Sequence, residues 1–247
     1  MKKQILTRAG MLDLLEKLAG TPSESSHTLY LTPRLSSTEL QNLIQELPAP
    51  PTVHEKLAEI ATGSPNGAVV FWSNQAKCLV QPPFPVGEKI LIPSLDVAPL
   101  RSLLARDYHI AVVLIRLGSY AIGVCRGEKL VTSKVGTGLV HGRHRQGGSS
   151  SHRFERHRDK QIEQFLIRVC GHAREQLEPY ARALDYMVYG GARTTILFLQ
   201  KYCPMLGKLE KPILPPLLDI PEPRQAVLET AISRVWSSTV YEWREED

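Results

Sequence analysis

Hydrophobic residues in the first hundred positions alternate between helical and strand-like spacing. Met11, Leu15 and Leu18 recur at intervals of three and four, between a Thr7 that can cap a helix and a Gly20 that can end it. Ser36 with Glu39, and Thr52 with Glu55, have the spacing of capping boxes, which predicts two more helices separated by a stiff, proline-rich connector at 48–51. The pattern then predicts a hairpin, a short strand and a helix, at 68–72 with 77–80, 90–92 and 99–105.

From residue 108 onward, the pattern changes to that of a meander followed by helices. Three apolar segments separated by Gly118-Ser119 and Gly127-Glu128 predict antiparallel strands at 109–116, 120–126 and 129–135. A long amphipathic helix is predicted to begin near His152. It is followed by a buried strand at 184–189, a helix at 197–202, a proline-rich stretch at 212–223 and a final helix that ends at the acidic tail 242–247.

These elements predict an α/β (α+β) protein with helices packed on a mixed sheet. We expect a small N-terminal α/β domain at 1–105 and a second domain at 106–247. In the second domain, a glycine-rich loop at 141–153 joins the last meander strand to the long helix. Both ends of such a loop are held by rigid elements while its tip is able to reach a partner.

Composition narrows the class of protein. The 247 residues are 43% hydrophobic and 22% charged, as in ordinary globular domains, and the longest apolar run, 110–115, is far too short to span a membrane. Acidic residues interrupt the segment after Met1-Lys2-Lys3, so we expect no signal peptide and a cytoplasmic protein. The four cysteines are scattered without a CxxC pair, which favours buried, reduced thiols over zinc ligands or a disulfide framework.

Positive charge is concentrated in one short segment. The formal net charge is +5, and residues 141–160 alone carry five arginines and one lysine against two acidic residues, a net +4. A focused basic patch indicates a polyanionic partner. The interpretation without chemistry is a solvated glycine-serine linker, which is the usual role of such tracts.

The same segment resembles the catalytic loop of eukaryotic and archaeal class-one peptide release factors. His141-Gly142-Arg143, Gly147-Gly148 and Arg153-Phe154-Glu155-Arg156 are similar to the family pattern HGRGGQSxxRFxR, which lies between a three-strand meander and a long helix. Matching strands flank it at 66–72 and 184–191, so the resemblance covers roughly 66–202. The short architecture is most similar to the Vms-like release factors of ribosome quality control and their bacterial relatives, which implies an RNase H-like catalytic domain. No stop-codon-reading NIKS motif is present, so codon-independent rescue is expected.

The sequence departs from the family at the catalytic glutamine. Counting back from Arg153-Phe154 places that position at Ser149, and the GxxQ spacing of the Vms-like proteins places it at Ser150. The only glutamine of the loop, Gln146, precedes the two glycines. Three alternatives follow: Gln146 acts from a shifted position, which we prefer, the loop works through its backbone, or hydrolysis is lost.

Glycine and arginine side by side suit chemistry at the 3′ end of an RNA. Ester hydrolysis needs an oriented water and donors for the developing oxyanion, which a carboxamide and the N–H groups of adjacent glycines supply. Flanking cations would hold phosphates. The predicted catalytic residues are Gln146, Gly147, Gly148, Ser149 and Ser150. The predicted RNA-binding residues are His141, Arg143, His144, Arg145, Arg153, Arg156, Arg158 and Lys160.

Competing interpretations of these residues are weaker. Histidines 141, 144, 152 and 157 lack accompanying cysteines or acids and lie among arginines, so no metal or other cofactor is expected. A serine of the loop with His152 lacks the G-x-S-x-G elbow of serine hydrolases. Tyr189-Gly190-Gly191 lacks the lysine of a P-loop, which favours a tight strand-to-helix turn. Trp236, Tyr241 and Trp243 have the spacing of packing residues.

The expected function is therefore hydrolysis of the peptidyl-tRNA ester on stalled ribosomes. The expected partners are the large ribosomal subunit and peptidyl-tRNA, without membrane or DNA. One alternative is a non-catalytic ribosome- or tRNA-binding module that lost the glutamine. A weaker alternative is a nuclease acting on the tRNA 3′ end, for which no acidic magnesium site is visible.

Overall fold

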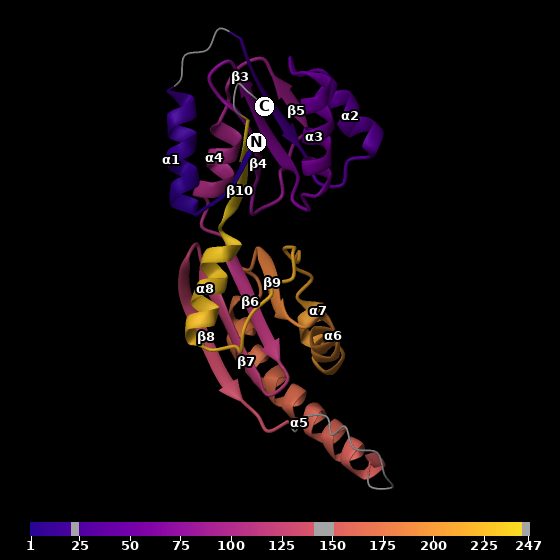
Figure 1. Cartoon of the computed structure of the whole chain (residues 1–247). Helices are drawn as coiled ribbons and strands as arrows, with labels where there is room; N and C mark the ends of the chain where they lie inside the picture. Colours follow the sequence, from indigo (N-terminus) through magenta and orange to yellow (C-terminus); the bar gives the residue numbers. More distant parts are fainter. Residues whose placement is uncertain (21–24, 141–150, 244–247) are drawn as a thin grey trace. The chain divides into compact units, whose positions relative to one another are not determined.

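The protein consists of two compact units (Figure 1). Unit 1 comprises residues 1–106 and 234–247, and unit 2 comprises residues 107–233. The computed structural model describes residues 1–20, 25–140 and 151–243, with the helical backbone alone for 151–154.

Unit 1 is a six-stranded sheet with helices on both faces. The strand order is β1-β10-β4-β3-β2-β5, and each neighbouring pair is antiparallel. The strands are β1 (Lys2–Leu6), β2 (Ser26–Leu31), β3 (Ala68–Ser73), β4 (Lys77–Gln81), β5 (Ile90–Ile92) and β10 (Ser238–Glu242). The helices are α1 (Arg8–Ala19), α2 (Ser37–Gln45), α3 (Pro51–Thr62) and α4 (Ala98–Ala105).

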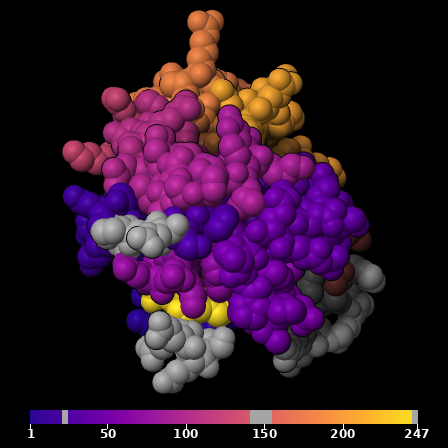
Figure 2. All heavy atoms as spheres, turned by 90° about the horizontal axis from the view of Figure 1, so that it is seen from above, coloured from indigo at the N-terminus to yellow at the C-terminus, as the bar shows by residue number. Residues whose placement is uncertain are grey.

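The two faces of this sheet carry different helices because strand residues alternate between them. Helices α1 and α4 pack with Val69, Phe71 and Val80 on one face. Helices α2 and α3 pack with Val70 and Leu79 on the other. In the space-filling view, the region of α2 and α3 forms the broad purple surface on the right (Figure 2).

Helix ends follow the predicted capping residues in two of three cases. The Thr7 hydroxyl accepts a hydrogen bond from the Gly10 N–H at 3.2 Å, and Ser36 with Glu39 forms a complete capping box. The expected Thr52 cap is wrong. Helix α3 begins at Pro51, whose fixed φ and missing N–H suit the first helical position, so no side-chain cap forms there.

Unit 2 contains the predicted meander, completed by one parallel strand. Strands β6 (His109–Arg116), β7 (Ser119–Arg126) and β8 (Lys129–Thr137) pair antiparallel, and β9 (Tyr186–Gly191) pairs parallel with β6. The helical segments are α5 (Ser151–Leu177), the 3-10 turn η1 (Glu178–Tyr180), α6 (Arg193–Tyr202), α7 (Pro204–Lys208) and α8 (Gln225–Val235). The mixed α+β class predicted from the sequence is confirmed.

The main core of unit 2 lies between its sheet and α5, α6 and α7. Phe165, Val169 and Leu199 of the helices pack on Val113 and Ile122 of the strands, and all five are 0–2% exposed. Helix α8 covers the other face of the sheet. There, a Cβ added to Gly123 of β7 would lie 3.2 Å from the side chain of Leu228 in α8.

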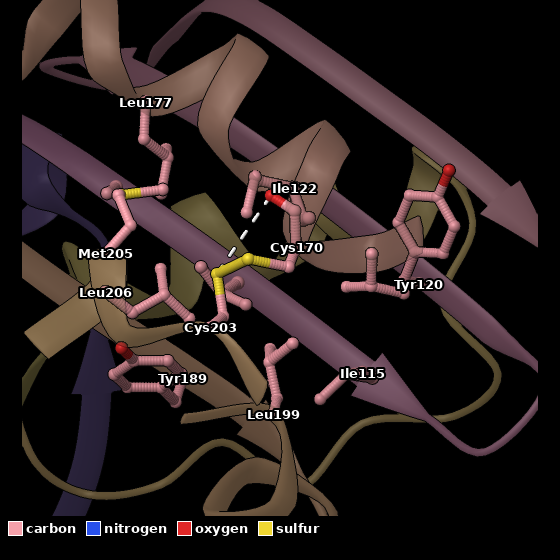
Figure 3. Packing of buried hydrophobic residues seen from close by; sticks show 14 of the residues in the cluster. Ile115, Tyr120, Ile122, Cys170, Leu177, Tyr189, Leu199, Cys203, Met205 and Leu206 are labelled. Carbon is pink, nitrogen blue, oxygen red and sulfur yellow. Dashed lines mark hydrogen bonds between the residues drawn. A yellow bond between two sulfur atoms is a disulfide. The ribbon is translucent and has the colours of Figure 1, made fainter. Parts of the chain in front are cut away.

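Two of the four cysteines form a disulfide, contrary to the expectation of reduced thiols. Cys170 of α5 and Cys203, between α6 and α7, are bonded, with their Cα atoms 5.2 Å apart (Figure 3). The spacing of the cysteines did not predict this pair. The two residues are 33 positions apart and come together only through the turn from β9 into α6. Cys78 and Cys125 are free and buried, as predicted.

The C-terminal segment differs from the predicted uninterrupted helix. Helix α8 ends at Val235, and β10 then enters the sheet of unit 1 between β1 and β4. Residues 234–247 therefore group with unit 1, whereas the sequence pattern placed all of 106–247 together. Successive side chains of β10 point to opposite faces of the sheet, so Val240 is buried in the core between Thr239 and Tyr241. Burial of Val240 stabilises this strand.

Among the residues that the structure describes, no helix is long and apolar enough to cross a membrane.

Candidate functional site

The predicted loop lies between the end of β8 and the start of α5. Its central part, residues 141–150, is outside the described residues, and so are the positions of His141, Arg143, His144, Arg145, Gln146, Gly147, Gly148, Ser149 and Ser150. Arg153 belongs to the first turn of α5, and its side chain is likewise outside the description. The geometry of the site is therefore that of its two supports.

The first support is the strand that leads into the loop. Strand β8 pairs with β7 up to Thr137, opposite Ser119. One residue later, the Gly138 N–H donates to the Gly118 carbonyl oxygen at 2.9 Å, beyond the last strand pair. The chain is thus held to the sheet until three residues before 141.

The second support is α5, whose beginning projects beyond its own core (Figure 1). No residue from 155 to 164 is buried, and Phe165, at 2% exposure, is the first described residue of this helix to be buried. At 1.5 Å per residue, the 14 residues from 151 to 164 rise about 21 Å. We call residues 151–164 the arm.

Helical spacing separates the charges of the arm into two stripes. Glu155, Asp159 and Glu163 follow one another at intervals of four, and so do Arg156 and Lys160 on the neighbouring stripe. Arg156 and Lys160 are exposed, whereas Arg158 is half-buried. Of the three cations at 155–164, Arg158 therefore lies off the stripe that Arg156 and Lys160 share.

The net charge of the protein belongs to unit 2. Residues 107–233 contain 18 lysines and arginines and 12 acidic residues, a net +6, while the remaining residues carry 12 and 13, a net −1. Residues 155–164 of the arm carry three charges of each sign. Half of the net +6 of unit 2 therefore lies in residues 141–153, which carry three arginines and no acidic residue.

Polar contacts fasten the inner half of α5 to the meander. The His172 ring stacks on Tyr120 of β7 with centroids 5.6 Å apart, and its Nδ1 lies 3.0 Å from a Glu175 carboxylate oxygen. Thr132 of β8 donates to the Gln176 side chain. Burial raises the pKa of Tyr120, an effect that nearby Arg168 opposes. The inner half of α5 is therefore firmly held to the meander, whereas residues 155–164 are not buried.

The glycine pair after β9 has a steric role. Gly191 has φ +117°, and a Cβ there would lie 1.9 Å from the Ile115 carbonyl oxygen. Its N–H donates to the Leu218 carbonyl oxygen at 2.9 Å, and α6 begins two residues later. This confirms the predicted tight turn.

In residues 1–20, 25–140 and 151–243, no group of three histidines, cysteines or acids could hold a metal ion. Histidines 141 and 144 lie outside these ranges. Trp236 and Trp243, at 0% and 9% exposure, are packing residues, as expected.

Sequence reasoning did not single out Gly136 and Gly138, which lie directly before the loop. The pattern that could have identified them is the alternation Val135-Gly136-Thr137-Gly138, because it places two glycines on the same face of an extended chain.

Known proteins that are similar to this chain include release factors. A family model described as "Actinobacteria/chloroflexi VLRF1 release factor" matches residues 108–241. Two curated relatives are each named "Peptide chain release factor subunit 1". The protein from Archaeoglobus fulgidus is 33% identical over 97 residues, covering 39% of this chain and 24% of its own length. The protein from Aeropyrum pernix is 25% identical over 139 residues, covering 51% of this chain and 36% of its own length.

The chain therefore spans about a quarter to a third of the length of these relatives. Among solved structures, the archaeal translation termination factor aRF1 is similar with a TM-score of 0.40 and 17% identity, over 93% of this chain and 73% of that one. The family model covers more than half of the 247 residues, including the meander, the loop and α5. This chain belongs to the actinobacteria/chloroflexi VLRF1 release factor family.

Proposed function

We propose that this protein hydrolyses the ester between a nascent peptide and tRNA on stalled ribosomes or large subunits, without reading a codon. The observation that carries the proposal is the basic loop sequence HGRHRQGG, joining β8 to the projecting arm, in a chain of a release factor family. The relatives' name, peptide chain release factor subunit 1, supports the same class of reaction. Such a substrate implies action in the cytoplasm.

The reaction adds one water across the ester. The water oxygen bonds to the carbonyl carbon, the bond from that carbon to the ribose oxygen breaks, and the proton of the water passes to the ribose oxygen. We assign the Gln146 carboxamide to orienting the water. The N–H groups of Gly148 and Ser149 are assigned to the developing oxyanion, since preorganised donors stabilise such charge. Gly147 allows the close backbone approach, and Ser150 is the alternative position of the family glutamine.

Binding is assigned to the basic residues on both sides of these groups. His141, Arg143, His144 and Arg145 precede the glycines, and Arg153, Arg156, Arg158 and Lys160 follow them. Contacts from cations to phosphates fix register without reading sequence. Exposed Arg156 and Lys160 on one stripe of the arm support this role.

We also propose a division of roles between the two parts of the chain. Unit 2 contains both supports of the loop, so hydrolysis is assigned to it. Unit 1 is assigned the place of a reduced N-terminal domain of the release factors, contributing to ribosome binding.

Ribosome–nascent-chain complexes with labelled peptidyl-tRNA test the proposal. Released peptide with intact tRNA is the expected product. In single-turnover reactions, Gln146→Ala should lower the rate about 10²-fold or more while leaving ribosome binding unchanged. Ser149→Ala and Ser150→Ala keep the glycines and the charges and test the two alternative positions of the family glutamine. A large loss in Gln146→Ala alone would support the shifted glutamine.

A second function is favoured by one observation: within the loop 141–153, no glutamine follows the two glycines. A non-catalytic ribosome- or tRNA-binding module would bind the same complexes and release no peptide from any of them. Shortened tRNA would instead indicate a nuclease. Either result would contradict the hydrolase.

A further inference from the structure

We infer that Gly136 and Gly138 of the β8 exit, together with the rings of Tyr120 and Phe165, are positioning residues. They fix the place and direction in which the chain leaves the sheet before residue 141. The catalytic consequence of this inference rests on the proposed hydrolysis, whereas its geometric part does not.

The first contact is between Gly136 and Tyr120. The two residues are direct partners in the register of β8 and β7. A Cβ on Gly136 would lie 2.4 Å from the Tyr120 hydroxyl oxygen and 2.7 Å from the ring carbon that bears it. The phenol ring therefore occupies the volume that any side chain at position 136 would need.

The second contact is between Gly138 and Phe165 of α5. A Cβ on Gly138 would lie 2.7 Å from Cδ2 of the Phe165 ring. From the other side, the Gly138 N–H donates to the Gly118 carbonyl oxygen, in a turn where Gly118 has φ +96°. Gly138 is thus held between a helix and a turn, with no room for a side chain.

Strand alternation makes these contacts a series. Residues 136, 138 and 140 point toward α5, because successive side chains of an extended chain alternate in direction. Val140, the first of the three to carry a side chain, packs on the core cluster that contains both rings, whereas Leu139 is 73% exposed. Three consecutive α5-facing positions are therefore fixed by packing immediately before the loop.

The rings cannot yield easily. Tyr120 and Phe165 are each 2% exposed, and their centroids lie 6.2 Å apart. Tyr120 also stacks on His172. Close-packed interiors resist displacement of large rings, so a side chain at 136 or 138 would move the strand rather than the rings.

A shift of the strand exit changes the position of whatever follows it. Misplacement of a reacting group by about 1 Å can lower a rate about 10²-fold. We therefore expect Gly138→Ala to lower the single-turnover release rate at least tenfold, with ribosome binding unchanged, because the cations of the loop and arm are retained.

Steric complementation is the decisive test. Phe165→Val removes the δ and ε carbons nearest to position 138, so Gly138→Ala should cost less than twofold in that background. Gly171→Ala is the matched control, because a Cβ on Gly171, also in α5, would meet no atom within 4 Å. A wild-type rate in Gly138→Ala, or equal losses in both backgrounds, would overturn the inference.

A second measurement needs no catalysis. Spin labels on Leu139→Cys and Gln164→Cys, both exposed positions, report the distance across the base of the loop. We expect Gly138→Ala to shift this distance and Phe165→Val to broaden its distribution, while Gly171→Ala leaves both unchanged. Should Gly138→Ala fail to fold, Phe165→Val still carries the test, and an unbroadened distribution would overturn the inference.

The two proposals fail separately. Wild-type protein that releases no peptide would refute the hydrolase, while the label distances would still decide whether these four residues position the exit of β8. Normal hydrolysis with unmoved distances would refute only the positioning role.

Discussion

The guanidinium carbon of Arg8 lies 4.3 Å from the centroid of the Trp236 indole ring. The same side chain donates from Nε to the Leu104 carbonyl oxygen at 2.8 Å and from Nη2 to the Ala105 carbonyl oxygen at 2.9 Å. Trp236 packs edge-on against Phe84, with the two ring centroids 4.6 Å apart. One arginine therefore links the end of α4, just before the chain leaves unit 1, to the residue with which the chain re-enters its core.

Arg8→Ala should destabilise unit 1 by about 2 kcal/mol, because it removes two charge-assisted hydrogen bonds and a cation–π contact. All three tryptophans, at 72, 236 and 243, belong to unit 1. Denaturant unfolding followed by tryptophan fluorescence therefore reports this unit. Arg101→Ala, which removes an exposed charge from α4, should change stability by less than about 0.5 kcal/mol. Equal effects of the two variants would contradict the assigned role of Arg8.

Charge reversal on the arm should weaken ribosome binding and flatten its salt dependence. If Arg156 and Lys160 each contact a phosphate, Arg156→Glu with Lys160→Glu should reduce the slope of log affinity against log salt by about 0.7–0.9 per contact. Arg182→Glu with Lys208→Glu makes the same charge change at exposed positions elsewhere in unit 2. An equal loss in both double variants would indicate a general effect of net charge.

Thiol titration should distinguish the two kinds of cysteine. Burial raises the pKa of Cys78 and that of Cys125 to about 12, so neither should react with a thiol reagent at pH 8 in the folded protein. Denaturant alone should expose these two thiols, and denaturant with reductant all four. Four thiols without reductant would contradict the disulfide. The disulfide closes a loop of 33 residues, so its reduction should lower the free energy of unfolding by about 3–4 kcal/mol.

The capping box of α2 should produce a measurable pH dependence. Hydrogen bonds from the Ser36 hydroxyl and Ser36 N–H, with Lys89 nearby, lower the pKa of Glu39 from 4.5 to about 2. Because this pKa is depressed in the folded state, the stabilisation is complete above the unfolded value and is lost as pH falls from 4.5 toward 2. The unfolding midpoints of wild type and Glu39→Gln should therefore differ most at pH 7 and converge progressively as the pH falls from 4.5 toward 2. A difference that is constant with pH would contradict this account.

Local signals predicted most of the elements. Thr7, Gly20 and the Ser36–Glu39 box marked helix ends correctly, and the meander was readable because Gly118 and Gly127 stand between its apolar segments. Strands β1, β2 and β10 were not predicted. Strands β1 and β10 are each five residues long and pair with each other across more than 230 positions, which leaves little trace in local spacing.

The site shows the same division between local and non-local information. The order strand, basic glycine-rich loop and helix follows from the sequence, and the structure has the two supports in this order. The packing of Gly138 on Phe165 depends on how α5 crosses β8, and the Cys170–Cys203 bond depends on the return of the chain through β9. Such contacts join residues that no periodicity relates.

The pairing of β10 between β1 and β4 also sets an order of events during synthesis. Unit 2 is a continuous stretch of chain, so all of its strands have been made once residue 191 has left the ribosome. The sheet of unit 1 has to wait until residue 242 before β1 gains a neighbour. Until then β1 and the adjacent edge of β4 expose unpaired backbone groups, the kind of edge that attracts other chains. The part of the molecule made first is therefore the last to be completed.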